Sequence, residues 1–175
     1  YKGAEQLAEI AAVATSIKQN LEGRGVSVKF DDRDNIKAGF KFNDYELKGV
    51  PLRIAIGPKD LEKNQVELAR RDTLEKTYVP QTELADLIPG LLEVMQDELY
   101  QKAKSYRDTH ITEVDSFDEF KEVLTNKGGF ISAHWDGTAA SEEAIKKATK
   151  ATIRCIPYAV KEEQGKCVCA GNNSP

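Results

Sequence analysis

The sequence predicts an α/β domain followed by a small α+β domain. Helix-like and strand-like hydrophobic patterns alternate from residue 4 to residue 79, an order typical of a layered α/β domain. A long helical pattern over 82–107 then ends this part, and a second alternation of strands and helices follows it. We therefore expect one domain at 1–107 and another at 108–175.

The first domain begins with a predicted helix rather than a strand. Over 4–23, apolar residues recur every three or four positions, and two glycines end the pattern. Apolar and polar residues then alternate over 26–30, which is typical of a strand with one buried face. Because a sheet of this kind is expected to have a strand before that first helix, we expect the sequence to continue upstream of Tyr1.

The remaining elements of the first domain follow from the same two periodicities. They are a short helix over 40–46 that ends at Gly49, strands over 51–57, 65–71 and 77–79, a turn over 58–64, and the long helix over 82–107.

The second domain contains another strand–helix–strand pattern. Ser116 and Glu119 have the spacing of a capping box, in which each residue bonds the other's backbone, and they precede a helix that contains Phe120. Strands are predicted over 130–135 and 151–157, with a helix over 141–149 between them. Cys155 lies inside the apolar second strand, so we expect a buried thiol there.

Composition excludes several classes of protein. The chain has 175 residues, of which 40% are hydrophobic and 31% charged, too apolar for disorder, and no apolar run approaches the ~20 residues of a membrane span. With three cysteines and no signal-peptide pattern, a reduced cytoplasmic protein without membrane attachment is expected. The net charge of −4 argues against binding nucleic acid by general phosphate neutralisation. Any contact with nucleic acid must use a local patch.

The usual catalytic motifs are missing. No glycine-rich phosphate loop or Gly-x-Ser-x-Gly elbow occurs, and the two histidines lie far apart in the sequence. Three aspartates follow the predicted strand over 26–30 and could hold a metal in a small α/β enzyme, but Asp is also favoured in such turns for local hydrogen bonding. They are Asp31, Asp32 and Asp34.

The segment over 30–72 is the most informative one. Its basic residues are interleaved with aromatic residues, a combination that can contact base edges and stack on unpaired bases. On spacing alone, a solvated charged surface with Phe42 and Tyr45 in the core is the simpler interpretation, since acidic residues are almost as frequent here.

The stretch VKFDDRDNIKAGFKFNDYELKGVPLRIAIGPKDLEKNQVELARRDT resembles the anticodon-binding domain of prolyl-tRNA synthetases of the archaeal/eukaryotic-like type. The segments GGFISAHWDGTA, KATIRCIP and GKCV resemble the C-terminal domain found only in that type. The resemblance covers essentially the whole chain. It implies a mixed sheet flanked by helices, followed by a small α+β domain.

The resemblance also implies function. A parent enzyme of this class II family ligates proline to tRNA(Pro) with ATP and Mg, in a catalytic domain that lies upstream and is not in this sequence. This chain is then expected to be inactive alone, to have no cofactor of its own, and to recognise the anticodon of tRNA(Pro). The parent is expected to be a homodimer through its catalytic domain. A free-standing RNA-binding module related to these domains is the alternative.

Eight residues are the candidates for anticodon contacts. In this family the domain reads two guanines shared by proline anticodons, and a guanine edge offers acceptors for Arg or Lys and donors for a carboxylate. We expect contacts to the bases from Arg33, Lys41, Glu46 and Lys48, although Glu46 could instead pair with a lysine on its own helix. One of the two aromatic residues, Phe42 or Tyr45, is expected to stack on a base. Arg53 and Arg70 are expected to contact the RNA backbone or to have structural roles.

The resemblance bears on a zinc site as well. In zinc-binding members, two cysteines five residues apart join two more from the segment matching 165–171. Here the first pair falls on Asp136 and Ser141, leaving Cys167 and Cys169. Zinc usually takes four N, S or carboxylate ligands, and a Ser hydroxyl is a poor one. We therefore expect a degenerate site that holds no metal.

Overall fold

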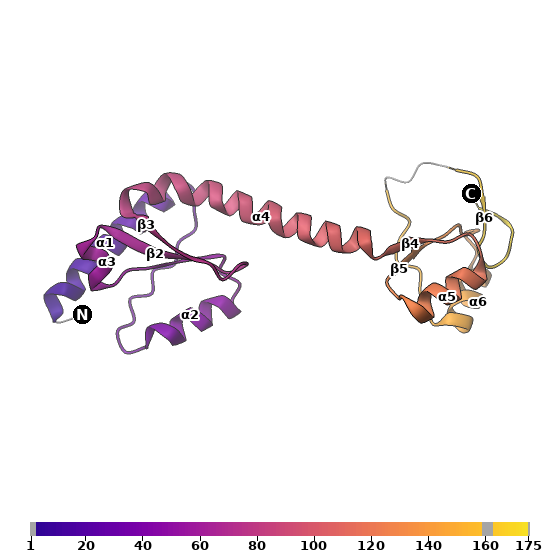
Figure 1. Cartoon of the computed structure of the whole chain (residues 1–175), viewed down its shortest axis with the longest axis horizontal. Coiled ribbons are helices and arrows are strands. Elements are labelled where there is room, and N and C mark those ends of the chain that lie inside the picture. Colours follow the sequence, from indigo (N-terminus) through magenta and orange to yellow (C-terminus); the bar gives the residue numbers. More distant parts are fainter. Residues whose placement is uncertain (1–2, 159–162, 175) are drawn as a thin grey trace. The chain divides into compact units, whose positions relative to one another are not determined.

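The computed structural model describes residues 3–158 and 163–174. It divides into two compact units, Tyr1–Gln101 and Lys102–Pro175, and each is described by itself. The division falls within the long helix α4 (Leu84–Thr109) (Figure 1).

A three-stranded antiparallel sheet forms the centre of the first unit. Its strands β1 (Leu52–Ala55), β2 (Gln65–Arg70) and β3 (Lys76–Pro80) lie in sequence order. Consecutive short connections explain the antiparallel pairing, in which Arg53 lies opposite Ala69, and Val66 opposite Val79. The rest of the unit consists of helices α1 (Ala4–Glu22), α2 (Ala38–Leu47) and α3 (Pro58–Glu62), the 3-10 turn η1 (Gln81–Glu83), and the first part of α4.

The two faces of this sheet differ in character. Alternate residues of β2, Val66 and Leu68, are buried against Ile17 and Leu21 of α1 and Leu84 and Ile88 of α4. The intervening strand residues, such as Arg53 and Glu67, point to the second side of the sheet, because successive residues of a strand point to opposite sides. Helix α2 lies on this second side, across the sheet from α4 (Figure 1), and none of its residues is fully buried.

The predicted strand over 26–30 is wrong. Val26 and Val28 pack against the core at the expected alternating positions, but this segment is not paired with any described strand. Periodicity predicts which side chains are buried, whereas a strand also needs a hydrogen-bonded neighbour. The predicted turn over 58–64 also differs, since Pro58 begins the short helix α3, where the Asp60 carboxylate accepts from the Gly57 N–H at 2.9 Å.

The second unit is built on a parallel pair, β4 (Ile111–Glu113) and β5 (Phe130–Ser132), joined by α5 (Phe117–Asn126). Helix α6 (Ala139–Thr149) follows, and a short hairpin of β6 (Gly165–Lys166) and β7 (Asn173–Ser174) comes last. Val114, Phe120, Ile145 and Val168 form its core. Helices with small parallel and antiparallel sheets confirm the predicted fold class.

Two predictions in the second unit can be compared directly. The capping box is confirmed in part: the Ser116 hydroxyl accepts from the Glu119 N–H at 3.2 Å, but the return bond of the Glu119 carboxylate goes to the Asp115 N–H at 3.3 Å, one residue before the cap, and to the Ser116 hydroxyl. The strand over 151–157 is wrong, and Cys155 is exposed rather than buried. The apolar run there has no described strand beside it, so its side chains remain partly in solvent.

Candidate nucleic-acid interface

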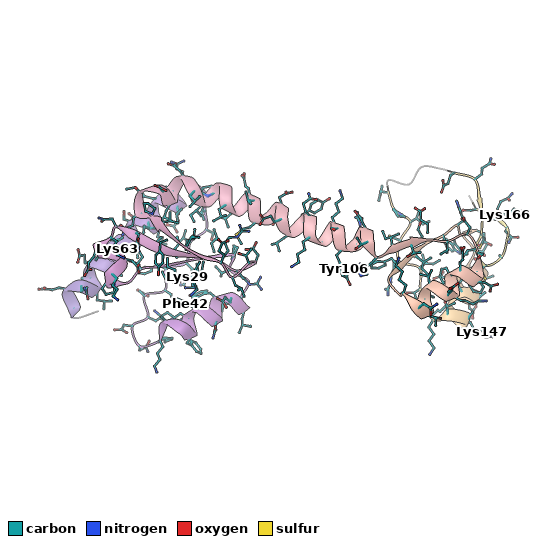
Figure 2. All side chains as sticks on the ribbon, in the orientation of Figure 1. Lys29, Phe42, Lys63, Tyr106, Lys147 and Lys166 are labelled. Atoms are coloured by element: carbon teal, nitrogen blue, oxygen red, sulfur yellow. The ribbon has the colours of Figure 1, made fainter. Side chains whose placement is uncertain are left out.

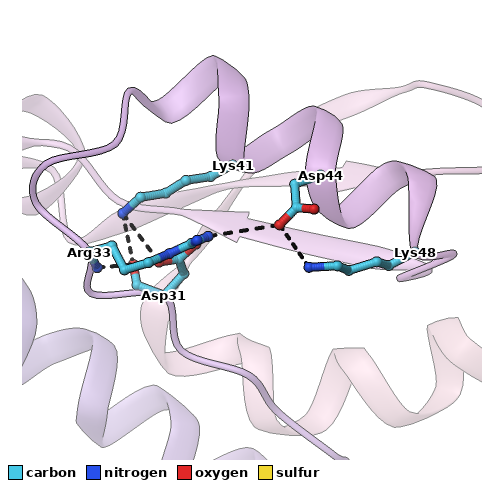
Figure 3. Close-up of polar contacts among 5 residues, drawn as sticks. All are labelled: Asp31, Arg33, Lys41, Asp44 and Lys48. Carbon is cyan, nitrogen blue, oxygen red and sulfur yellow. Dashed lines mark hydrogen bonds and ion pairs between the residues drawn. The ribbon is translucent and has the colours of Figure 1, made fainter.

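The loop after residue 30 and one side of α2 form a cluster of charges. Lys41, Asp44 and Lys48 are three and four residues apart and therefore share one side of this helix. Asp31 and Arg33 of the loop lie against the same side (Figure 3).

Asp31 is the centre of this cluster. Its two carboxylate oxygens accept from Arg33 Nε at 2.8 Å and from Arg33 Nη2 at 2.6 Å. Lys41 Nζ lies 3.5 Å from the same carboxylate and donates to the Asp31 backbone carbonyl at 3.1 Å. These hydrogen bonds, first of all those from Arg33, hold the pKa of the Asp31 carboxyl well below its usual range. Asp31 is therefore ionised at neutral pH and orients two of the predicted cations.

Asp44 holds the third cation. Its carboxylate accepts from Lys48 Nζ at 2.8 Å and lies 3.9 Å from Arg33 Nη2 (Figure 3). Lys48 also lies over the ring of Tyr45, with Nζ 5.1 Å from the ring centroid. The lysine that ends this helix thus pairs with Asp44 and not with Glu46.

A cavity of about 230 Å³ opens beside the cluster. It is lined by Lys29, Phe30, Asp31, Asp32, Arg33, Tyr45 and Lys48. The volume is below the roughly 300 Å³ at which pockets for drug-sized ligands begin. A single flat base between a tyrosine ring and an arginine is a ligand of suitable size and chemistry.

Phe42 and Arg53 contact each other on the second side of the sheet. Figure 2 shows Phe42 between α2 and the strands, and the Arg53 guanidinium carbon lies 3.6 Å from its ring centroid. Arg53 Nη1 also donates to Glu67 at 3.3 Å, and the side chain is only 16% exposed. Arg53 Nε is buried without a hydrogen-bond partner in the part of the chain that the structure describes. Arg53 therefore joins α2 to the sheet.

The arginines that follow β2 are also engaged. Arg70 donates to both oxygens of Asp72, at 3.1 and 2.7 Å, and to Glu98 of α4. The hydrogen bonds from Arg70 lower the pKa of the Asp72 carboxyl. Arg71 Nε donates to the backbone carbonyl of Glu46 at 2.8 Å, which ties the end of α2 to the strand.

The predicted residues therefore form two neighbouring groups. Arg33, Tyr45 and Lys48 line the cavity, and Lys41 reaches it through Asp31. A smaller cleft of about 20 Å³ lies next to Phe42, Tyr45, Glu46, Arg53 and Arg70, so that Tyr45 belongs to both groups.

The sequence prediction missed two carboxylates of the cluster, Asp31 as a partner of Arg33 and Lys41, and Asp44 as a partner of Lys48. The signals were available, because Asp31 is two residues from Arg33 and Asp44 is four residues before Lys48. The local hydrogen bonding expected of an Asp in this turn is present at Asp31, which accepts from the Arg33 backbone N–H at 3.2 Å.

Two of the four positions expected to form a degenerate zinc site, Asp136 and Ser141, belong to a hydrogen-bond network. The Asp136 carboxylate accepts from the Ser141 hydroxyl at 2.5 Å, the Thr138 hydroxyl at 2.9 Å and Asn172 Nδ2 at 3.2 Å. Trp135 Nε1 in turn donates to Ser141 Oγ at 2.8 Å. These bonds, mainly the one from Ser141, lower the pKa of Asp136 to about 2.

This donor set does not fit zinc. Cys167 is buried and Cys169 half-buried, but Ser141 Oγ is occupied by hydrogen bonds and the Asp136 carboxylate is already satisfied. Within residues 3–158 and 163–174, no three His, Cys, Asp or Glu side chains are placed to hold a metal ion. The same part of the chain contains no helix long and apolar enough to cross a membrane.

Comparison with protein families agrees with the two units. Residues 3–91 match the family described as "Anticodon binding domain". Residues 117–175 match the family described as "Prolyl-tRNA synthetase, C-terminal".

Similar proteins carry both parts. A proline–tRNA ligase of Christiangramia forsetii is 60% identical over 99% of this chain, and one of Porphyromonas gingivalis is 51% identical over the whole chain. The chain spans 35% of the length of each of these relatives.

A solved structure of prolyl-tRNA synthetase from Cryptosporidium parvum, complexed with halofuginone and AMPPNP, matches 95% of this chain with 37% identity and a TM-score of 0.82. A second structure of that enzyme, with L-proline and AMP, gives 34% identity and a TM-score of 0.78. The chain covers 35% of each of these solved chains. By these matches the chain belongs to the prolyl-tRNA synthetase family, and it comprises the anticodon-binding and C-terminal domains of that family.

Proposed function

We propose that this chain recognises the anticodon of tRNA(Pro), and that it does so as part of a cytoplasmic enzyme that joins proline to that tRNA with ATP and Mg. The observation that carries the proposal is the cavity bordered by Arg33, Tyr45 and Lys48 in a domain of the anticodon-binding family. We further propose that the whole enzyme is a homodimer through its catalytic domain.

The cavity offers the two kinds of contact that an unstacked base requires. Tyr45 presents a ring on which a base can stack, and stacking is worth about 1–3 kcal/mol per base. Arg33 and Lys48 present hydrogen-bond donors toward the N7 and O6 acceptors of guanine. The neighbouring Asp31 and Asp44 reduce the local positive charge. Binding then depends on fit to the base more than on attraction to phosphate.

Glu46 supports the same proposal from the other side of Tyr45. It lines the smaller cleft, and among the residues that the structure describes no cation pairs with its carboxylate. A free carboxylate can accept from the amino and imino groups of guanine. We infer that the two groups of residues contact the two guanines of the anticodon, with Tyr45 between them.

Binding to an RNA hairpin tests the proposal. A hairpin with the anticodon arm of tRNA(Pro) is titrated with the chain at fixed salt, beside a hairpin whose two anticodon guanines are replaced by adenine. We expect the native hairpin to bind more tightly. Arg33→Ala should lower its affinity by about 1–3 kcal/mol, the range for one lost bidentate base contact. Lys63→Ala, which changes a lysine outside both groups, is the matched control and should leave the affinity unchanged.

Equal binding of the two hairpins would overturn the proposal. A free-standing RNA-binding module is the second candidate, and the aminoacylation assay separates the two. When the catalytic domain is present on the same polypeptide, Arg33→Ala should lower charging of tRNA(Pro) in proportion to its effect on hairpin binding.

A further inference from the structure

The contact between Arg33 and Asp31 uses the Nε and Nη2 edge of the guanidinium, while the Asp44 carboxylate lies 3.9 Å from Nη2. Nε and Nη2 of Arg33 donate to the two oxygens of Asp31, which is the bidentate arrangement that fixes a planar guanidinium most firmly. Nη1 has no hydrogen-bond partner in the described part of the chain. Because the five N–H groups of Arg form a rigid fork, fixing one edge also fixes the direction of the other.

Asp31 is suited to act as this fixed point. Its side chain is 11% exposed, whereas that of Arg33 is 42% exposed. Lys41 contacts both the carboxylate and the backbone carbonyl of Asp31, so the residue is held from the α2 side as well. The less exposed partner therefore constrains the more exposed one, and both Arg33 and Asp31 line the cavity.

We propose that Asp31 is a positioning residue, which holds Arg33 with its Nη1 edge available to a guanine and thereby sets the preference for guanine over adenine. This inference rests on the proposed anticodon recognition and adds a residue that need not touch the RNA. Guanine presents two acceptors, N7 and O6, whereas adenine presents one acceptor and one donor in the same places. A fixed pair of donors discriminates between them, while a mobile side chain can turn to avoid the mismatch.

Removing the charge of Asp31 has two opposite effects on RNA binding. Loss of a negative charge increases the attraction to any RNA, because phosphate dominates that attraction. Loss of the fixed guanidinium lowers the preference for guanine. The ratio of the affinities for the two hairpins therefore reports positioning, and the absolute affinities do not.

Asp31→Asn and Asp34→Asn form the matched pair of variants. Both remove one carboxylate charge from the same loop, but among the described residues the carboxylates that pair with Arg33 are those of Asp31 and Asp44, not that of Asp34. The native hairpin and the hairpin with adenine in place of the guanines are titrated against the chain and both variants. We expect Asp31→Asn to lower the guanine preference about tenfold, within the range for one bidentate base contact. Asp34→Asn should change both affinities by the same factor.

The motion of Arg33 Nε–H in the unaltered chain gives a second measurement that does not depend on how the variant folds. Nuclear magnetic resonance relaxation should give an order parameter near the roughly 0.85 of rigid groups, since below about 0.6 a group is flexible. In Asp31→Asn the value should fall, and in Asp34→Asn it should not.

Each result has one consequence. If the unaltered chain prefers the guanine hairpin and Asp31→Asn shows the same preference, the positioning role is overturned and anticodon recognition stands. A flexible Arg33 Nε–H in the unaltered chain also overturns it. An unaltered chain without guanine preference overturns both proposals.

Discussion

Tyr45 and Phe42 are three residues apart on α2, but their neighbours assign them different tasks. Tyr45 lines both the cavity and the cleft, and the Lys48 Nζ atom over its ring is 5.1 Å from the ring centroid. Phe42 is covered by Arg53, a partly buried arginine whose Nη1 is bound to Glu67. We therefore predict that Tyr45, and not Phe42, is the ring that stacks on a base.

Substituting the two rings should separate binding from stability. Tyr45→Ala should weaken binding of the native hairpin by about 1–3 kcal/mol through the loss of stacking, while Tyr45→Phe keeps the ring and should bind as before. Phe42→Ala should instead lower the free energy of unfolding by about 1–3 kcal/mol, because Arg53 loses its aromatic partner. Hairpin titration and urea denaturation measure the two quantities, and the reverse pattern would contradict the assignment.

Asp136 makes the stability of the second unit depend on acid. Its pKa is lowered to about 2 in the fold, against about 3.9 for an unfolded Asp. A lowered pKa stabilises the fold fully above the unfolded pKa, and this contribution is lost as the pH falls from about 4 toward about 2. Trp135, the single tryptophan of the chain, bonds to the same network and can report its unfolding.

Asp136→Asn should therefore lower the melting temperature followed by Trp135 fluorescence at pH 6, and the deficit should shrink as the pH approaches 2. Glu143→Gln, which removes an exposed carboxyl of α6 outside the network, is the control. A deficit that stays constant across this pH range would show that the Asp136 charge does not stabilise the unit.

At the scale of elements, the turn between β2 and β3 contains a strained residue. Leu74 has a φ of 61°, in the left-handed region where a side chain costs about 1–2 kcal/mol, and it is 71% exposed. The Arg70 N–H donates to the Glu75 carbonyl across this turn at 3.0 Å, so the hairpin holds that conformation. Glycine would adopt it without a steric penalty.

Leu74→Gly should be more stable than Leu74→Ala by about 0.5–1 kcal/mol, since both remove the exposed side chain but only glycine removes the strain. Urea denaturation of the two variants measures the difference. Equal stability would mean that the turn relaxes when the leucine is removed.

The elements also show how far sequence reasoning reached. Helices α1, α2, α4, α5 and α6 were predicted because their periodicity and caps are local signals, and β1, β2, β3 and part of β5 followed from alternation. The segments over 26–30 and 151–157 have the composition of strands without a described partner, which a linear pattern cannot reveal. The aspartate partners of Arg33 and Lys48 are a different case, because both lie within four residues of their partners and the short spacing is visible in the sequence.

At the scale of the whole chain, two separate cores predict two unfolding transitions. One core contains Val66, which is fully buried, and the other contains Ile145. Each belongs to a different compact unit. Small single domains usually unfold in one cooperative step, so each unit should have its own transition.

Calorimetry of the full chain with two core variants tests this. Ile145→Ala removes buried methyl groups, costs about 2–5 kcal/mol, and should lower only the transition that Trp135 fluorescence also reports. Val66→Ala should lower only the other one. If either substitution shifts both transitions equally, the two units unfold as one.

Helix α2 has a consequence for how such a surface can change over time. It provides Lys41 and Asp44 of the cluster and part of the lining of the cavity and the cleft, yet it contributes no fully buried residue. The contacts that attach it include Phe42 with Arg53, the Glu46 carbonyl with Arg71, and Lys41 with Asp31. Its outward positions can therefore mutate without opening a void in the core. The residues that α2 presents to a ligand can therefore change during evolution while the core beneath them stays the same.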